Sequence, residues 1–303
     1  MIFFPWRRAL RSTTVWFSLL VMLTFGLLAW LAPSIAPHDP YEGSFTQTRL
    51  PPMWVQGISK PGMPEYPLGT DSFGRDIFSR LIHGTRTVFF LVLTAVPLAA
   101  LIGTLLGLIA GHAGGRLDAW IMLLTDMVSA LPGIMFVVII VLIFRNLLTP
   151  TWFNGLITLV VGFAAIGWVS LARLIRINVL QIKSKSFMEA SVALGAAPWR
   201  IITRHLLPNV LHVIMIWIIN NIPAIILLEA VLGYIGIDIT RAADGGEFTV
   251  VSWGGMFFSG RSALSSNPLI LIIPSLCILL ISMSFILLGD FLNTVTRQEY
   301  ERE

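Results

Sequence analysis

Two acidic residues, Asp126 and Glu229, lie inside long apolar stretches of the sequence, and two adjacent amides, Asn220 and Asn221, share the stretch of Glu229. A charged side chain within a bilayer is costly, so it commonly faces a water-filled cavity or a partner charge. These four residues are therefore candidates for a polar pathway or for intramembrane contacts. The alternative is that each acid lies near the end of a span and reaches the headgroup region.

The sequence shows no pattern for catalysis or for holding a cofactor. It contains no G-x-x-x-x-G-K-[ST] phosphate loop, no H-E-x-x-H and no G-x-S-x-G. The five histidines show no metal-ligand spacing, and Cys277 is the only cysteine, so no internal disulfide can form. We expect no catalytic residue, no metal, no cofactor and no nucleotide hydrolysis. If this chain transports a solute, the energy comes from an ion gradient or from another chain.

The composition predicts an all-α polytopic membrane protein. The chain has 303 residues, of which 56% are hydrophobic and 12% are charged, whereas ordinary soluble domains have roughly 25% charged residues. About 20 mainly apolar residues are needed to cross a bilayer as a helix. Six stretches are long enough, and we expect six transmembrane helices. They are residues 15–37, 88–111, 119–144, 152–172, 210–236 and 269–289.

Glycines and prolines indicate spans that pack against protein. Glycine recurs at every fourth position from Gly103 to Gly111, which places small residues on one helix face where another helix can approach. Four prolines fall within the predicted spans, where neighbouring helices can satisfy the freed carbonyl groups. They are Pro97, Pro132, Pro223 and Pro274.

The distribution of basic residues predicts the orientation. Loop 173–209 holds six Lys or Arg residues against one acid, and the N-terminus adds three arginines. Short basic loops stay in the cytoplasm, so we expect this loop and both termini to be cytoplasmic. Segment 38–87, with five basic and five acidic residues, is expected outside. The formal charge of +4 therefore reflects topology, and nucleic acid is not an expected partner.

The first apolar stretch has a second interpretation. Three arginines precede it and residues 32–37, APSIAP, follow it, as in a signal peptide with a small-residue cleavage site. The stretch is longer than the 7–15 apolar residues usual in such peptides. We favour a retained membrane anchor.

Residues 186–209 form a segment with charged residues between two apolar stretches. Ser186-x-x-Glu189 matches the capping box that begins a helix, and Gly195 suits the left-handed residue that ends a short one. Pro198 then suits the first position of a second helix. We expect that helix to run to Leu207.

Beyond Leu207, Pro208 is expected to turn the chain into the next span. In the first helix, Phe187, Ala190, Ser191 and Leu194 share one face. An apolar face in water usually marks a binding site for another protein. The alternative is that it packs on the protein's own helix ends.

Segment 186–209 resembles the E-A-A-x3-G-x9-I-x-L-P motif in the cytoplasmic loop of ABC importer permeases. Five positions match, namely Glu189, Ala190, Gly195, Leu207 and Pro208. Ser191 replaces the third residue of the motif, and His205 replaces the isoleucine.

Other segments resemble the dipeptide, oligopeptide and nickel permeases, and in particular the second permease of each pair. Residues 67–76, PLGTDSFGRD, and 79–82, SRLI, are similar to the signature that follows the first span. Further matches are LEA at 228–230, SWG at 252–254 and LGD at 288–290. Two departures are Gly233, where the family often has serine, and a polar insert at 241–250.

The resemblance implies a type I ABC importer permease core with an extra N-terminal span, in a bacterial inner membrane. The implied partners are a second homologous permease, one or two ATPase subunits, an extracytoplasmic solute-binding protein and membrane lipid. The implied substrate is a di- or oligopeptide, with nickel and oligosaccharides as alternatives. The implied ATPase-coupling residues are Phe187, Met188, Glu189, Ala190, Leu194, Gly195 and Trp199.

The expected organisation has four parts. They are a cytoplasmic N-terminus and anchor at 1–37, an extracytoplasmic segment at 38–87, a transmembrane domain at 88–290 with its coupling loop at 173–209, and a cytoplasmic tail at 291–303. A gradient-driven secondary transporter is the competing class, but it would more often show an internal repeat and a pair of discontinuous helices. A membrane scaffold without transport would not need prolines and carboxylates inside its spans.

Overall fold

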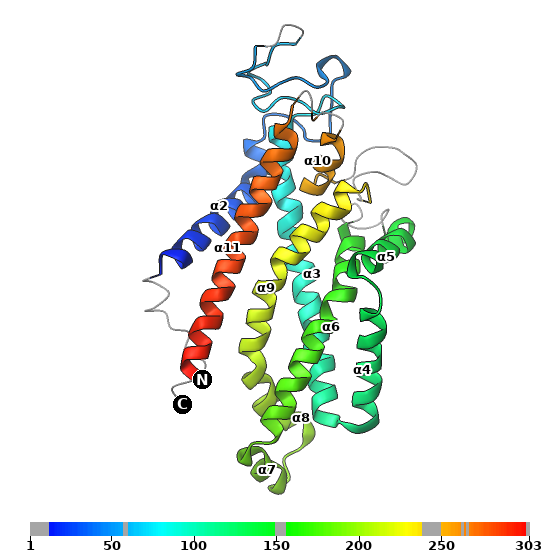
Figure 1. Cartoon of the computed structure of the whole chain (residues 1–303), viewed down its shortest axis with the longest axis vertical. Helices are drawn as coiled ribbons and strands as arrows, with labels where there is room; N and C mark the ends of the chain where they lie inside the picture. The colour runs from blue at the N-terminus through cyan, green and yellow to red at the C-terminus, as the bar shows by residue number, and fades with distance from the viewer. Residues whose placement is uncertain are drawn as a thin grey trace.

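Long helices run along the longest axis of the molecule (Figure 1). The computed structural model describes residues 12–56, 60–148, 156–237, 250–261, 264 and 267–300. Five helices are long and apolar enough to cross a membrane, and a bent helix pair makes a sixth span if it is counted as one. The five are α2 (Thr13–Ile35), α3 (Ile77–Ala113), α6 (Leu156–Lys183), α9 (Leu207–Tyr234) with the residues that lead into it, and α11 (Leu269–Tyr300). The predicted all-α membrane fold is confirmed.

The third predicted span, 119–144, is sharply bent. It consists of α4 (Gly115–Ser129) and α5 (Gly133–Leu148), which meet at 89°. Pro132 lies in the break, and a proline disfavours helical backbone in the residue before it, here Leu131. The other three prolines lie inside α3, α9 and α11, as expected.

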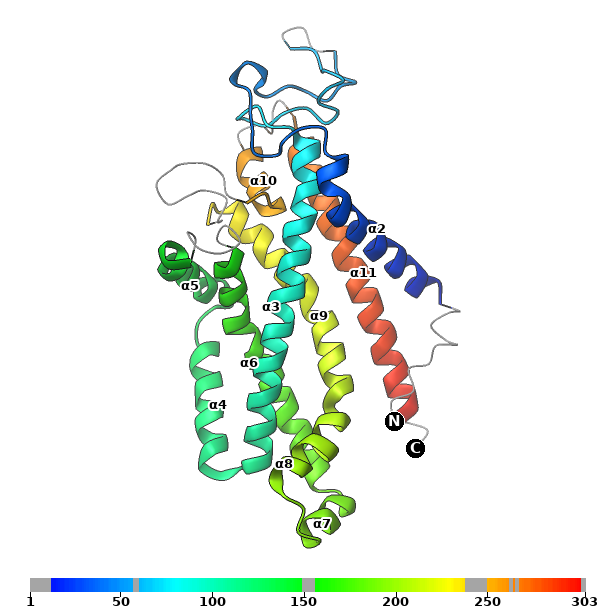
Figure 2. The same cartoon turned by 180° about the vertical axis from the view of Figure 1, so that it is seen from behind.

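The α3 helix is central, with α6 packed along it (Figure 2). The predicted glycine face makes this contact. A Cβ added to Gly103 would lie 2.7 Å from the carbonyl oxygen of Trp168, and one on Gly107 would lie 2.6 Å from that of Ala172. One on Gly111 would lie 2.7 Å from Cβ of Val179. Only glycine allows the two backbones to approach this closely.

A short helix, α10 (Trp253–Gly260), packs against α3, α9 and α11. Trp253 is fully buried, and its indole N–H donates to the carbonyl oxygen of Leu81 at 3.0 Å. A Cβ on Gly233 of α9 would lie 2.1 Å from the carbonyl carbon of Gly254. A serine at position 233 does not fit this arrangement, which accounts for the glycine. Of the polar insert at 241–250, all but Val250 lies outside the described residues.

The described residues of segment 36–76, here named the cap, are 36–56 and 60–76; they form loops at one end of the bundle, with one short 3-10 helix, η1 (Phe45–Gln47). At the base of the cap, the Asp76 carboxylate caps α3 by accepting from the backbone N–H groups of Phe78 and Ser79, at 3.3 and 3.0 Å. The Asn267 amide, just before α11, donates to the carbonyl oxygen of Leu68 at 2.9 Å. The cap is therefore joined to both α3 and α11.

The opposite end of the bundle carries two small helices, α7 (Ser186–Ala193) and α8 (Pro198–Ile201). A π-helical turn, Ile202–Leu206, then leads directly into α9. The expectation that Pro208 turns the chain is therefore wrong. A proline ring clashes with the carbonyl four residues before it in an α-helix, and the wider π turn just before Pro208 relieves that clash.

Candidate functional site

The loop at the α7 end is a helix, a tight turn and a second helix, as predicted. Gly195 has a positive φ of 75°, and its N–H donates to the carbonyl oxygen of Val192 at 2.9 Å. Pro198 begins α8. Only glycine adopts this backbone conformation without strain, so Gly195 fixes the angle between the two helices.

The capping box predicted at Ser186 is wrong. The N-cap residue is Lys185, so Ser186 is already helical, and no side chain caps this end. The helix begins one residue earlier than the capping box requires. Glu189 still lies in the first turn of α7, where the helix dipole favours a carboxylate.

The α7 loop carries four large exposed apolar side chains, here together named the knob: Phe187, Val192, Leu194 and Trp199. All four side chains are exposed, Leu194 by 88% and Trp199 by 66%. Ala190 and Glu189 are also exposed, whereas Ser191 is half-buried. Large apolar side chains exposed on a surface loop indicate a candidate interaction site.

Met188 has the opposite role in the loop. It is buried and belongs to the hydrophobic core, so it anchors α7 to the bundle. The ring of Phe187 lies 6.3 Å from that of His205, which places His205 against α7. The departure from the motif at His205 therefore still contributes a packing contact.

A cavity of about 370 Å³ separates α7 from the ends of α3 and α6. Glu189 lines it, together with His112 of α3 and Lys183 of α6. The Lys183 ammonium donates to the carbonyl oxygens of His112 and Gly111, at 2.8 and 3.4 Å. It thereby satisfies carbonyl groups that the end of α3 leaves without helical partners.

Asp126 forms an ion pair with Arg173, at 2.8 Å, between α4 and α6. The same guanidinium donates to the hydroxyl oxygens of Thr125 and Ser129, at 3.1 and 3.0 Å. The Asp126 and Arg173 side chains are 69% and 41% exposed. A second pair, Arg176 with Asp118, joins the same helices nearer the α7 end. No local sequence pattern indicates these pairings, because the partners are 47 and 58 residues apart.

The three candidates on α9 lie in different surroundings from Asp126. The Asn221 amide donates to the carbonyl oxygen of Trp217 in its own helix, at 2.8 Å. Asn220 is exposed and faces Gly289 of α11, whereas Glu229 is 3% exposed and packs against Gly254 of α10. The structure therefore does not gather the four candidates into one cluster.

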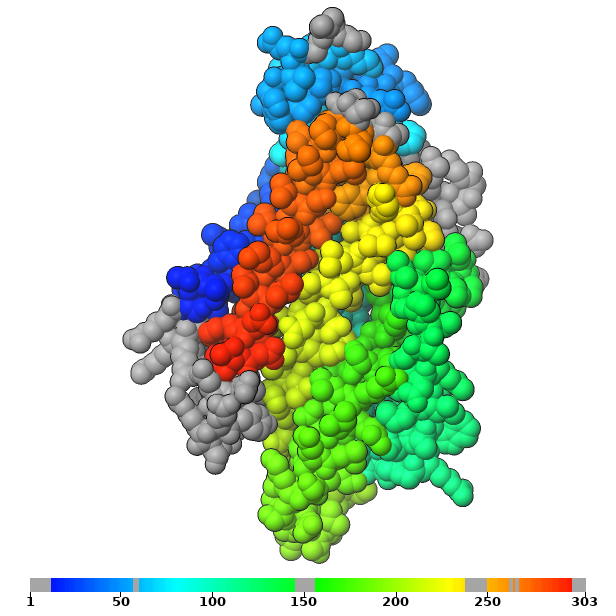
Figure 3. Space-filling view, in the orientation of Figure 1, coloured from blue at the N-terminus to red at the C-terminus, as the bar shows by residue number. Residues whose placement is uncertain are grey.

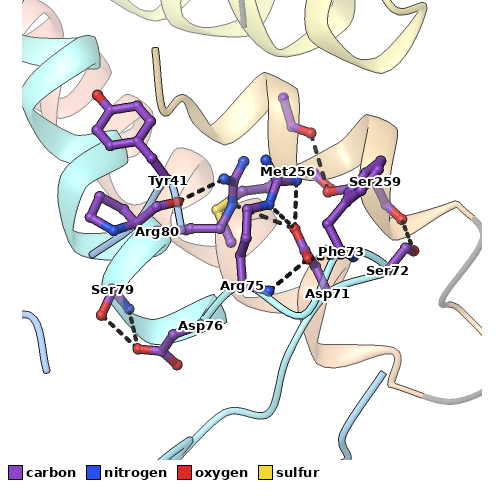
Figure 4. Close-up of polar contacts among 12 residues, drawn as sticks. Tyr41, Asp71, Ser72, Phe73, Arg75, Asp76, Ser79, Arg80, Met256 and Ser259 are labelled. Atoms are coloured by element: carbon purple, nitrogen blue, oxygen red, sulfur yellow. Dashed lines mark hydrogen bonds and ion pairs between the residues drawn. The ribbon is translucent and has the colours of Figure 1, made fainter. Parts of the chain in front are cut away.

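The 67–76 motif forms a buried ionic network in the cap (Figure 4). The Asp71 carboxylate accepts from the backbone N–H groups of Phe73 and Arg75, at 2.8 and 3.1 Å. It also pairs with the Arg75 guanidinium at 2.6 Å, and the Arg80 guanidinium lies 3.8 Å away. All three ionic side chains are at most 2% exposed. The motif was recognised from the sequence, but its structural role was not.

Within the described residues, no group of three or more His, Cys, Asp or Glu side chains is placed to hold a metal ion. Candidate functional features among the described residues include the knob, the ion pair of Asp126 and Arg173, and the cap. Together with the apolar helices, they define a multi-pass helical membrane protein.

The comparisons with known proteins place this class in a family. Residues 103–300 match the family described as the inner membrane component of binding-protein-dependent transport systems. Residues 5–52 match the N-terminal transmembrane domain of oligopeptide transport permease C. The chain belongs to the family of binding-protein-dependent transport inner membrane components, and it is a permease of that family.

Individual relatives cover almost the whole chain. The dipeptide transport permease DppC of Haemophilus influenzae is 34% identical over 91% of this chain and 87% of its own length. The oligopeptide transport permease OppC of Bacillus subtilis is 30% identical over 91% of this chain and 82% of its own. The glutathione transport permease GsiD of Pectobacterium atrosepticum is 34% identical over 95% of this chain and 88% of its own length.

Proposed function

We propose that this chain is one of two permease subunits of an ATP-driven importer of di- or oligopeptides. It forms half of the translocation pathway, receives its solute from an extracytoplasmic binding protein and is driven by separate ATPase subunits. The observation that carries this proposal is the knob, an exposed apolar surface on a stiff loop at one end of a membrane-spanning bundle.

The knob is proposed to transmit movements of the soluble ATPase subunits to the membrane-spanning helices. Met188 anchors α7 to the core, and the left-handed turn at Gly195 holds the two small helices at a fixed angle. A force on the exposed Leu194 is therefore proposed to reach the bundle through Met188 and through the contact of α7 with α6. The proposed coupling residues are Phe187, Met188, Glu189, Ala190, Leu194, Gly195 and Trp199.

In the proposed orientation, the α7 end is cytoplasmic and the cap is extracytoplasmic. The six basic residues of loop 173–209 favour this orientation. Both termini are then cytoplasmic, the knob meets the ATPase subunits, and the cap faces the binding protein. The proposed boundaries are those expected from the sequence, with the anchor at 1–37 and the transmembrane domain at 88–290.

The pair of Asp126 and Arg173 supports a water-lined face on α4 and α6. Asp126 lies 11 residues from Gly115, the first residue of α4, which corresponds to about 16 Å along the helix. This is about half of a 30 Å hydrocarbon core. Hydrocarbon does not solvate an exposed ion pair, so this face is proposed to line the pathway.

The names of the relatives support a peptide substrate. They designate dipeptide, oligopeptide and glutathione transport, and glutathione is itself a small peptide. Nickel and oligosaccharides remain the alternative substrates. The binding protein is proposed to select the ligand, since the polar candidate residues in the spans of the permease are few and do not cluster.

The test is uptake by the complete transporter in proteoliposomes, with a radiolabelled dipeptide and the binding protein on the outside. We expect uptake only with ATP at the ATPase side, and no response to a proton gradient alone. Uptake driven by the gradient without ATP would instead establish a secondary transporter. Competition by unlabelled nickel or oligosaccharide, but not by peptide, would refute the peptide assignment.

A further inference from the structure

An apolar cavity of about 700 Å³ lies between α9 and α11, beside α10. Val231 and Tyr234 of α9, Phe257 of α10, and Leu271, Leu279 and Ile286 of α11 are among its lining residues. The two long helices lie side by side on the face of the molecule shown in Figure 3. The cavity is therefore walled by membrane-spanning helices, and its lining matches hydrocarbon.

The Arg261 guanidinium lies at the cap end of this cavity. The guanidinium carbon of Arg261 lies 4.3 Å from the ring centroid of Tyr234 and 5.3 Å from that of Phe258. Tyr234 thus both lines the cavity and holds the arginine. Arg261 is exposed, and no ion pair joins it to an acid in the described part of the chain. The cation–π contacts fix its position without using its N–H donors.

We propose that this cavity binds an anionic glycerophospholipid, with the phosphate on Arg261 and an acyl chain along α11. From Leu271 to Ile286 the cavity follows 15 residues, or about 22 Å of helix, which exceeds one leaflet of a 30 Å core. An acyl chain fits this length. A guanidinium binds phosphate through paired charge-assisted hydrogen bonds. An anionic headgroup is favoured over phosphatidylcholine, because the positive ammonium group of choline would repel the Arg261 guanidinium.

The first experiment measures lipid retained by the complete transporter after detergent extraction from membranes that contain phosphatidylglycerol and phosphatidylcholine. Native mass spectrometry counts bound lipid in the wild type, Arg261→Gln, Arg261→Lys and Ser275→Phe. We expect phosphatidylglycerol to be retained by the wild type and Arg261→Lys, and retention to fall about tenfold in Arg261→Gln. Ser275 lines the cavity, so phenylalanine there should displace the lipid while Arg261 stays in place.

Lys60→Gln is the matched control, because it removes one exposed positive charge from the cap, away from the spans. It should retain lipid as the wild type does. Equal retention by wild type and Arg261→Gln would overturn the proposal, as would preferential retention of phosphatidylcholine. If Ser275→Phe does not assemble, the comparison of the two Arg261 variants decides alone.

The second experiment identifies what covers the cavity in the membrane. A photoreactive phenylalanine at Leu279, which lines the cavity, is irradiated in native membranes. Cross-linked phospholipid supports the proposal. A cross-link to the second permease, without lipid, would overturn it and assign the cavity to the interface between subunits. Neither experiment uses transport as a readout, so the result is independent of the proposed function.

Discussion

The Lys183 ammonium of α6 donates a hydrogen bond to the carbonyl oxygen of His112 in α3, at 2.8 Å. This contact joins the ends of the two central helices three residues before α7 begins. It is a polar contact in the wall of the cavity beneath α7. In the proposed function, it lies where movement of the knob reaches the bundle.

Replacing Lys183 with methionine keeps the aliphatic stem and removes both hydrogen bonds to α3. A hydrogen bond to a charged donor contributes about 1.5–3 kcal/mol, and the loss should loosen the end of α6. We expect near-normal membrane levels but reduced solute-stimulated ATP hydrolysis in the complete transporter. Lys183→Arg retains a donor and should recover most of the stimulation. Equal stimulation of ATP hydrolysis in wild type and Lys183→Met would show that this contact does not contribute to coupling.

Gly107 should not tolerate a larger residue. A Cβ at this position lies 2.7 Å from Cβ of Ile175, so Gly107→Leu must separate α3 from α6. Overpacking costs about 1–3 kcal/mol or more. The measurement is the thermal unfolding midpoint of the purified protein. Leu105→Met is the control, since Leu105 is exposed on the same helix, and it should leave the midpoint unchanged. A Gly107→Leu protein as stable as the control would refute the packing described here.

Asp71→Asn should unfold the cap. The substitution leaves the buried guanidinium groups of Arg75 and Arg80 facing a neutral amide, and breaking a buried ion pair costs about 3–5 kcal/mol. We expect limited proteolysis to cut the cap several-fold faster while the spans stay intact. Glu42→Gln, at an exposed position of the cap, should be cut at the wild-type rate. Resistance of Asp71→Asn to proteolysis would contradict a structural role for the network.

Much of this fold follows from local rules in the sequence. Length and hydropathy located the spans, the spacing of Gly103 to Gly111 predicted a helix-packing face, and Gly195 marked the turn. The failures come from effects that act beyond a local pattern. The break at Pro132 divides a stretch whose hydropathy is continuous, and α7 begins at Ser186 without the side-chain cap that the capping box predicts. The partner of Asp126 is 47 residues away, so only the tertiary structure reveals it.

The ion pair of Asp126 and Arg173 provides a test of the pathway. Exposed ion pairs contribute only about 0–1 kcal/mol to stability, so Asp126→Asn should leave the amount of folded protein unchanged. If this face lines the pathway, the uncompensated arginine should alter uptake of charged peptides more than that of neutral ones. Exchange of the two residues, Asp126→Arg with Arg173→Asp, should restore the pair and the wild-type preference. Identical uptake profiles for wild type and Asp126→Asn would remove this face from the pathway.

The central claim, that the knob couples ATP hydrolysis to transport, is tested most directly with Leu194. This side chain is 88% exposed, so Leu194→Asp should cost little stability and should act mainly on a docked partner. Gly195→Val tests the turn in the same assay, since a left-handed conformation costs roughly 1–2 kcal/mol for a residue with a Cβ.

The measurement is solute-stimulated ATP hydrolysis and peptide uptake by the reconstituted transporter, at matched permease content. Leu101→Asn, on an exposed face of α3, controls for loss of a large apolar side chain elsewhere. We predict that Leu194→Asp and Gly195→Val lower hydrolysis and uptake together by about tenfold or more, as expected when an apolar interface anchor is lost. Wild-type uptake and wild-type stimulation in Leu194→Asp would contradict the coupling role of the knob.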